Sequence, residues 1–279
     1  MTEKLLDILI PAYGNPLGVK KILATVSKNE LVNVTVSDDS VKENDIQHIK
    51  DLCAYYKVTY LSGNRSGAVS NWNLLLSRAT CQYSVLVHHD EYFSNTNFIY
   101  KLLELEDIQF MVLPVVVKHP NNISRFVYSW QQRLLIRWFK GFGPMLNILG
   151  GPTALLIFKT SKLVKFNPNL VYQVDCEWYA KMLNNVSHKN INFYRGSRVV
   201  STVMPGSITD TIKDNLHAVI RSDVEVLKRT SWSDTMTKYS IYGNLILFAY
   251  RLVLISSFIP FYIKRFFVKK NERSEKKGE

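Results

Sequence analysis

The chain has 279 residues, of which 47% are hydrophobic and 21% charged, so it can bury a sizeable core and does not have the composition of a disordered protein. Lysine and arginine (35) outnumber aspartate and glutamate (23), and the net charge of +12 favours an anionic partner: a phosphorylated ligand, a nucleic acid or an acidic membrane surface. Three cysteines without metal-ligand spacing suit a reducing cytoplasm better than a disulfide framework. The first residues do not form a signal-peptide pattern.

The first hundred residues predict a regular alternation of strands and helices. We expect strands at 6–10, 32–36, 58–61 and 83–87, with helices at 16–28, 44–56 and 68–78 between them. Short strands that alternate with helices indicate βαβ units, and therefore a mostly parallel mixed sheet flanked by helices.

The second half is less regular. Strands are expected at 110–117, 152–158, 191–193 and 199–203, and a helix at 174–183. Apolar residues at helical spacing predict a further helix over 123–140, with Trp130, Arg133, Arg137 and Trp138 along it.

An apolar stretch at 245–263 precedes a tail rich in lysine and arginine. Nineteen residues are long enough to span a bilayer, but Arg251 near the middle and Pro260 both oppose a span. Three interpretations stay open: a helix that lies in the membrane interface with the tail on anionic headgroups, a true span, or an ordinary core or dimer helix. We favour the first, and expect 236–279 to be a membrane-associating helical segment attached to a main domain at 1–235.

Polar side chains follow the ends of the first four predicted strands. Tyr13 follows the first, Asp38 and Asp39 the second, Arg65 the third, and the run 88–91 (HHDE) the fourth. Ligands bind to parallel sheets at the carboxyl ends of the strands, so we expect these side chains to share one site.

The run 88–91 has the composition of a site for a hard cation. Asp90 is the natural ligand for Mg²⁺ or Mn²⁺, with Glu91 or His88 assisting directly or through water. The same run also suits a polar turn before a helix that begins near Ser94. Arg65, together with Asn71 on the first turn of the next predicted helix, suits a phosphate or nucleotide, although Asn71 could equally be a capping residue.

Five stretches, IPAYGN, VSDDS, RSGAVSNWNLLLSRA, VHHDE and VDCEWY, resemble in order and spacing the family 2 glycosyltransferases of the GT-A fold, in particular bacterial enzymes of O-antigen and capsule assembly. The resemblance is strong over residues 6–93, weaker up to 183, and absent from the C-terminal segment. It implies an α/β GT-A fold, with a Rossmann-like nucleotide-sugar half at 1–107 and an acceptor half at 108–235.

The resemblance also implies roles for residues. The nucleotide sugar would be held by residues at the strand ends and by a small-residue strand of the second half: Pro11, Ala12, Tyr13, Asp38, Asp39, Arg65, Asn71, His89 and Gly151. The family's DxD metal motif falls on 88–90, where His88 replaces the first aspartate, and Ala12 replaces a threonine of the family pattern. Asp175 matches the catalytic base, which would take a proton from the acceptor hydroxyl, and Glu177 stays open as an alternative.

We therefore expect a metal-dependent, inverting glycosyltransferase that uses Mn²⁺ or Mg²⁺. It would transfer a hexosyl or N-acetylhexosaminyl group from a nucleotide-diphosphate sugar, UDP-linked in our expectation, to a saccharide carried on a polyprenyl diphosphate. The expected location is the cytoplasmic face of the bacterial inner membrane, peripheral or monotopic, next to other polysaccharide-assembly enzymes. The alternatives are a catalytically inactive scaffold, which His88 makes plausible, and a sugar-nucleotide nucleotidyltransferase, which lacks its glycine-rich phosphate loop here. A nucleic-acid binder is disfavoured because the basic residues cluster beside apolar helices.

Overall fold

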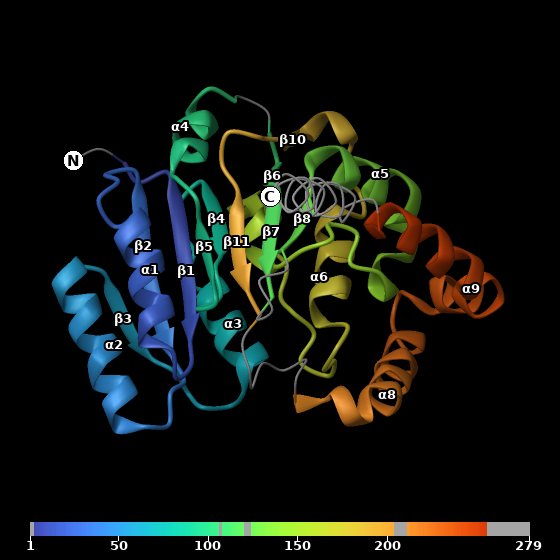
Figure 1. The fold of residues 1–279 in the computed structure, drawn as a ribbon, viewed down its shortest axis with the longest axis horizontal. Helices are drawn as coiled ribbons and strands as arrows, with labels where there is room; N and C mark the ends of the chain where they lie inside the picture. Colours follow the sequence, from blue (N-terminus) through green and yellow to red (C-terminus); the bar gives the residue numbers. More distant parts are fainter. Residues whose placement is uncertain (1–2, 106–107, 120–123, 204–210, 256–279) are drawn as a thin grey trace, which may run out of the picture.

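The computed structural model describes residues 3–105, 108–119, 124–203 and 211–255 (Figure 1). The elements up to β4 follow the predicted alternation: β1 (Leu6–Ala12), α1 (Pro16–Val26), β2 (Val32–Asp38), α2 (Glu43–Tyr56), β3 (Thr59–Ser62), α3 (Ala68–Leu76) and β4 (Tyr83–Leu86). They are followed by a short strand that was not predicted, β5 (Glu91–Phe93), and by α4 (Asn97–Leu103). Those of the second half are β6 (Phe110–Val112), β7 (Val115–Lys118), β8 (Ser124–Val127), α5 (Ser129–Phe139), β9 (Leu156–Lys159), α6 (Val174–Leu183), β10 (Ile191–Phe193), β11 (Val199–Thr202), α8 (Leu216–Lys228) and α9 (Ser233–Ile255).

A seven-stranded sheet in the order β10-β6-β9-β4-β1-β2-β3 forms the centre of the molecule. Its strands are parallel to their neighbours except β9, which is antiparallel to both β4 and β6, so the prediction of a mostly parallel mixed sheet is confirmed. Every residue of β1 is buried, as expected for a strand with both faces covered. The one acid among them, Asp7, accepts hydrogen bonds from the Asn33 amide and from the backbone N–H groups of Thr80 and Cys81.

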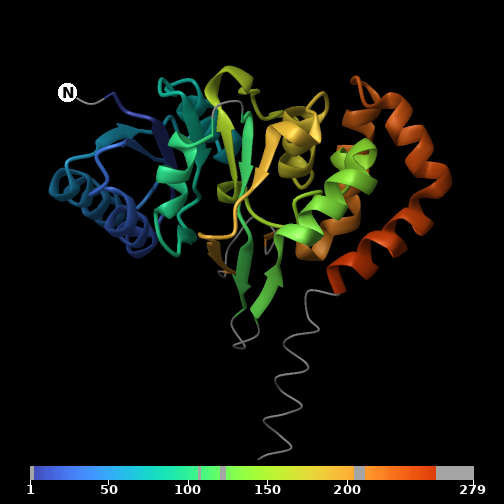
Figure 2. The same ribbon diagram turned by 90° about the horizontal axis from the view of Figure 1, so that it is seen from above.

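A second, four-stranded sheet in the order β5-β11-β7-β8 lies beside the first. β11 is antiparallel to β5 and parallel to β7, and β8 closes the sheet as an antiparallel edge strand. The two views show α1 and α2 at one end of the molecule and α8 and α9 at the opposite end (Figures 1 and 2).

Two predicted elements of the second half are wrong in outline. The single strand expected at 110–117 is divided between the two sheets: β6 belongs to the first and β7 to the second, with Leu113 and Pro114 between them. Proline has no N–H to donate to a sheet ladder, which is consistent with the break at this point. The helix expected at 123–140 begins only at Ser129, because Ser124–Val127 pairs with β7 as a strand. Residue 123, the first residue of the expected helix, lies outside the described residues.

The C-terminal segment is seen only in part. Helix α9 begins at Ser233, before the boundary expected at 235, and packs against α5 through the Phe139–Tyr250 ring contact and a hydrogen bond from Gln131 Nε2 to the Val253 carbonyl. Within the described part of the chain, none of the helices combines the length and the apolar character that a membrane crossing requires. Residues 256–279, which include the rest of the apolar stretch and the basic tail, lie outside the described residues.

Candidate active site

The carboxyl ends of β4, β1, β2 and β3 lie side by side, because these four strands are parallel neighbours in that order. The sheet therefore brings together the polar residues that follow each strand. This arrangement confirms that the four sequence clusters belong to one edge of one sheet.

The loops after β2 and β3 form the acidic part of this edge. Asp38 is buried; its Oδ1 accepts from the Ser40 N–H at 2.9 Å and its Oδ2 from the Tyr60 hydroxyl at 3.3 Å. Asp39 Oδ1 accepts from the Arg65 N–H at 3.1 Å. A Cβ on Gly63 would come within 1.9 Å of that same Oδ1, so only glycine allows Asp39 this position.

Arg65 and Tyr13 are the exposed members of the edge. Arg65 has a left-handed backbone with φ of 54°, and its side chain lies in solvent. Tyr13 is 59% exposed. Both side chains can approach a ligand lying on the edge, whereas the side chains of Pro11 and Ala12 are buried in the core and leave only backbone atoms to contribute.

The loop after β4 is held by the start of α1. The Asn15 side chain caps α1 by accepting from the Gly18 N–H at 3.0 Å, and its Nδ2 donates to the His89 carbonyl at 3.0 Å. A Cβ on Gly18 would lie 1.8 Å from that carbonyl. His89 Nδ1 lies 3.3 Å from the Pro11 carbonyl, so His89 joins the ends of β4 and β1.

His88 is held on three sides. Its ring stacks on Trp72 with centroids 4.7 Å apart, its Nδ1 lies 3.5 Å from Glu91 Oε1, and its Nε2 lies 3.4 Å from the Thr153 hydroxyl. Burial, and to a lesser degree the charge of His89, lowers the pKa of His88 to about 3. His88 is therefore neutral at physiological pH, and a proton on Nδ1 directed at Glu91 leaves the Nε2 lone pair as the acceptor.

Glu91 is a buried carboxylate that organises the loop. Its Oε2 accepts from the His88 and Ala154 N–H groups, each at 3.2 Å. Burial raises its pKa and so does the charge of Asp90, while the two N–H groups act in the opposite direction. Burial also raises the pKa of Asp90, against the charge of His89.

Asp175 reaches the same region from the first turn of α6. Its side chain is half-buried and its Oδ1 is closed off from solvent with no hydrogen-bond partner in the described structure. Burial, followed by the charge of Asp90, raises its pKa to about 6. Asp175 also raises the pKa of Glu91, so the three carboxyl groups are close enough to interact although they come from opposite halves of the chain.

The second half supports this position through Gly151 and Tyr179. Tyr179 lies one turn after Asp175 on α6, is fully buried, and donates to the Gly151 carbonyl at 3.2 Å. A Cβ on Gly151 would lie 2.7 Å from Leu155 Cδ2 and 2.8 Å from Val115 Cγ1. Gly151 is thus required by close packing beneath the site.

Two of the expected site residues are buried and contact other parts of the protein. Glu177 is fully buried, and its Oε1 lies 2.6 Å from Lys181 Nζ on the same helix. Asn71 is also buried, and its Nδ2 donates to the Ser37 carbonyl at 3.1 Å, which ties α3 to the end of β2. The structure therefore favours Asp175 over Glu177 at the cluster and gives Asn71 a positioning contact.

Sequence reasoning did not find Asp223, a buried acid on α8. Its two oxygens accept from the N–H groups of Val171, Tyr172 and Gln173 at 2.8 to 3.0 Å, and so hold the loop that enters α6 just before Asp175. An acid on an amphipathic helix normally faces solvent, so no local signal marked it. Trp72 and Thr153, the partners of His88, were equally hidden because they come from distant segments.

The donor set fits a divalent cation. Ligand atoms of His88, Asp90 and Glu91 all lie within 4.8 Å of one another. Asp90 offers an anionic oxygen. His88 would offer Nε2 in place of its contact with the Thr153 hydroxyl, while Glu91 holds the other ring nitrogen, as carboxylates commonly do behind a metal-bound histidine. Carboxylate oxygen with imidazole suits Mn²⁺ and does not exclude Mg²⁺.

Comparison with solved structures gives the same fold. The chain is similar to residues 1–349 of TarS from S. aureus (14% identity, TM-score 0.56, covering 81% of this chain and 66% of that one), a protein also solved with UDP-GlcNAc. It is similar to the mannosyltransferase PcManGT from Pyrobaculum calidifontis in complex with GDP-Man and Mn²⁺ (12% identity, TM-score 0.56, covering 83% of this chain and 66% of that one). It is also similar to glucosyl-3-phosphoglycerate synthase from Mycobacterium tuberculosis with Mn²⁺, UDP-Glc and glycerol 3-phosphate (14% identity, TM-score 0.52, covering 81% of this chain and 80% of that one).

These identities are too low to transfer a substrate, but they confirm the expected GT-A fold. A search of curated proteins found no match to the chain. The family model described as "Glycosyl transferase family 2" matches residues 7–170, more than half of the sequence and the part that contains β1 to β4, the loop 88–91 and Gly151. The family match, the polar residues at the edge of the sheet and the similarity to solved structures all agree. The chain therefore belongs to glycosyl transferase family 2.

Proposed function

We propose that this protein is an inverting, metal-dependent glycosyltransferase that moves a sugar from UDP to a hydroxyl group of a lipid-linked saccharide. The observation that carries the proposal is the electrostatic interaction of Asp90 with Asp175: Asp90 belongs to a cluster after β4 that could hold a cation, and its charge helps to raise the pKa of Asp175 on α6. Inversion needs one carboxylate to take the proton of the attacking hydroxyl and needs no covalent nucleophile.

The chain's own residues divide into three tasks. Tyr13, Asp38, Asp39 and Arg65 lie where the nucleotide would rest, at the ends of β1 to β3. A divalent ion held by Asp90 and His88 would neutralise the charge of the leaving diphosphate. Asp175, with a pKa of about 6, is ionised at neutral pH yet basic enough to accept a proton.

The structural relatives support a nucleotide-diphosphate donor, since they were solved with UDP-GlcNAc, UDP-Glc or GDP-Man, two of them with Mn²⁺. We choose Mn²⁺ over Mg²⁺ because His88 offers a nitrogen ligand, which Mg²⁺ accepts less readily. Two of these three relatives were solved with a UDP-sugar, which supports UDP, and the choice of an O antigen or capsule as the product follows from the family resemblance of the sequence motifs.

The exposed face of α9 supports a location on a membrane surface. Ile241, Leu245, Phe248, Leu252 and Ile255 are each more than half exposed and recur every three or four residues, so they form one apolar stripe. An apolar stripe followed by a basic tail is typical of helices that lie in the interface of an anionic membrane. We place the protein on the cytoplasmic face of the bacterial inner membrane, where polyprenyl-linked acceptors are assembled.

Release of UDP from a panel of UDP-sugars, with and without Mn²⁺, tests the enzymatic proposal. The wild-type protein should hydrolyse one donor slowly in the presence of Mn²⁺, and Asp90→Ala should abolish that release while the far-UV circular dichroism stays unchanged. Asp51→Ala, which removes an exposed acid from α2, is the matched control and should keep full activity. Donor binding without turnover in the wild type would favour the inactive scaffold instead.

Flotation with phosphatidylcholine vesicles that contain phosphatidylglycerol tests the location. The double substitution Leu245→Ser and Phe248→Ser should release the protein from the vesicles. Leu17→Ser, at an equally exposed apolar position on α1, should not. Equal flotation of both variants would remove α9 from the proposal.

A further inference from the structure

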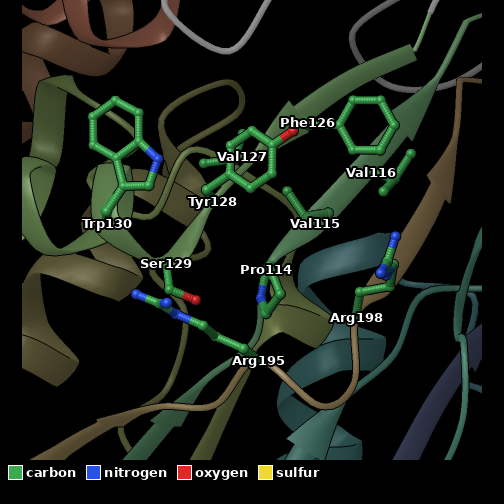
Figure 3. Close-up of a pocket in the computed structure, with 10 residues that line it drawn as sticks. All are labelled: Pro114, Val115, Val116, Phe126, Val127, Tyr128, Ser129, Trp130, Arg195 and Arg198. Atoms are coloured by element: carbon green, nitrogen blue, oxygen red, sulfur yellow. The ribbon is translucent and has the colours of Figure 1, made fainter. Parts of the chain in front are cut away.

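A hollow of about 220 Å³ lies over the second sheet, away from the loop 88–91. Its floor consists of β7 and β8, one wall is the start of α5, and the other is the loop between β10 and β11 (Figure 3). The rings of Phe126, Tyr128 and Trp130 follow one another along one side, and Arg195 and Arg198 extend from the other. The volume is smaller than that of most sites for a whole ligand, so the hollow suits one end of a larger molecule.

Both arginines are available to a ligand. Arg195 and Arg198 are exposed, and neither forms an ion pair within the part of the chain that the structure describes. In β5, β7, β8 and β11, all of which are described, the one acidic residue is Glu91, whose carboxylate is engaged inside the loop after β4. The hollow therefore carries an uncompensated positive charge.

The lining is otherwise apolar and aromatic, with one unused hydroxyl. Trp130 is 45% exposed at the rim, and Tyr128 stacks on Phe126 with centroids 6.2 Å apart. Ser129 is 2% exposed, lines the hollow, and its Oγ has no partner in the described structure. Two guanidinium groups and a free hydroxyl beside an apolar wall match a phosphate ester joined to a hydrocarbon chain.

Strand β11 runs from the hollow to the loop that carries Asp90, whereas Glu91 of β5, opposite Ser201, lies on the other face of the sheet. Side chains alternate along a strand, so Val200 and Thr202 of β11 share one face, and Arg198 is the residue just before this strand. The Thr202 N–H donates to the Asp90 carbonyl at 3.0 Å. Four residues of strand place Arg198 roughly 13 Å from that contact. Lys118, the partner of Thr202 on β7, adds a further positive charge at the metal end of the face.

The other side of the hollow leads to α9. Gln131 Nε2, one residue after Trp130, donates to the Val253 carbonyl at 3.1 Å, so the rim of the hollow adjoins the C-terminal end of α9. The exposed Leu252 and Ile255 are at that end. An apolar chain that leaves the hollow past Trp130 would meet the apolar stripe of α9.

We propose that Arg195 and Arg198 bind the phosphate of an isoprenoid-linked acceptor, whose hydrocarbon chain passes Trp130 towards α9 while its saccharide extends along β11 to Asp90 and Asp175. The assignment rests on the proposed transfer to a lipid-linked acceptor and names the residues that recognise it. It separates the acceptor's phosphate site from the diphosphate site of the donor.

Calorimetric titration with farnesyl diphosphate, a short soluble isoprenoid diphosphate, tests the site without any turnover. The exposed arginines can be replaced without disturbing the fold, and Arg195→Gln combined with Arg198→Gln should weaken binding at least tenfold, because each removes a charged donor. The affinity of this double variant for UDP should stay unchanged. Arg78→Gln, which removes an exposed arginine after α3, is the control and should bind farnesyl diphosphate as tightly as the wild type. Trp130→Ala should weaken farnesyl diphosphate binding but not that of inorganic pyrophosphate, and Trp138→Ala, on the same helix and 58% exposed, should change neither.

Three results would overturn the assignment. The first is that the double arginine variant binds farnesyl diphosphate as tightly as the wild type. The second is that the wild type binds octyl glucoside as tightly as farnesyl diphosphate, which would show that the hollow is only an apolar groove. Loss of binding to phosphatidylglycerol vesicles with unchanged binding of farnesyl diphosphate would assign the arginines to the membrane surface. Because none of these measurements requires sugar transfer, a failure of the proposed enzymatic activity would be seen separately, in the donor hydrolysis assay.

Discussion

Asp175→Asn should make the protein more stable and inactive at the same time. Asp175 has a pKa of about 6 instead of its ordinary 3.8, because its carboxylate is buried and lies near Asp90. That difference corresponds to about 3 kcal/mol by which the folded state disfavours the ionised side chain at neutral pH. An asparagine of the same shape carries no charge but still buries an amide, so we expect a gain of about 1–3 kcal/mol in the free energy of unfolding.

The pH dependence gives the sign of the effect. The folded state binds the proton of Asp175 more tightly than the unfolded state, so this group stabilises the protein below about pH 4, and that contribution is lost as the pH rises through about 6. The difference in stability between Asp175→Asn and the wild type should therefore be small near pH 4 and reach its full size above pH 6.

Urea unfolding in the presence of EDTA, followed by circular dichroism across this pH range, measures the difference. Turnover with Mn²⁺ should fall by about 10²–10⁴, the usual contribution of a general base. Glu177→Gln is the matched control: it breaks the contact with Lys181, so it should not stabilise the protein, and it should leave turnover within a few-fold. A variant of Asp175 that is less stable at pH 7, or that keeps its activity, would refute the reasoning.

Three further substitutions test how the site is held. Asp223→Ala removes the acceptor of three N–H groups, of which that of Gln173 is buried, and should cost about 1–3 kcal/mol of stability, measured by urea unfolding; unchanged stability would contradict the anchoring of α6. Gly63→Ala displaces Asp39 and should weaken UDP binding at least tenfold by calorimetry, whereas Gly141→Ala, where a Cβ meets nothing within 4 Å, should not. Glu91→Gln loosens the imidazole that it holds and should lower Mn²⁺ affinity by about 10–100-fold in electron paramagnetic resonance titrations; equal affinity would show that the carboxylate has no part in the metal site.

The sequence predicted the first half well because its signals are local. Each strand up to β4 is a short run rich in Val, Ile, Leu or Tyr, each helix has its own apolar spacing, and a polar cluster follows each strand. Parallel neighbours must then bring those clusters to one edge, so the candidate metal loop at 88–91 and the acidic pair at 38–39 could be predicted without coordinates. Asp175 could be proposed as well, although only through the family resemblance.

Contacts between distant segments decided the rest. The spacing at 123–140 predicted one helix, but pairing with β7 converts Ser124–Val127 into a strand, since hydrogen bonds to a neighbouring strand outweigh weak local preferences. The choice between Asp175 and Glu177, two acids on one helical turn, depends on which of them faces Asp90 and which faces Lys181. Asp223 acquires its role only because α8 folds against the loop before α6. Local patterns determine which elements form and which residues end them. The raised pKa of Asp175, the anchoring of its helix and the hollow beside α5 instead arise from packing between parts of the chain that no local pattern connects.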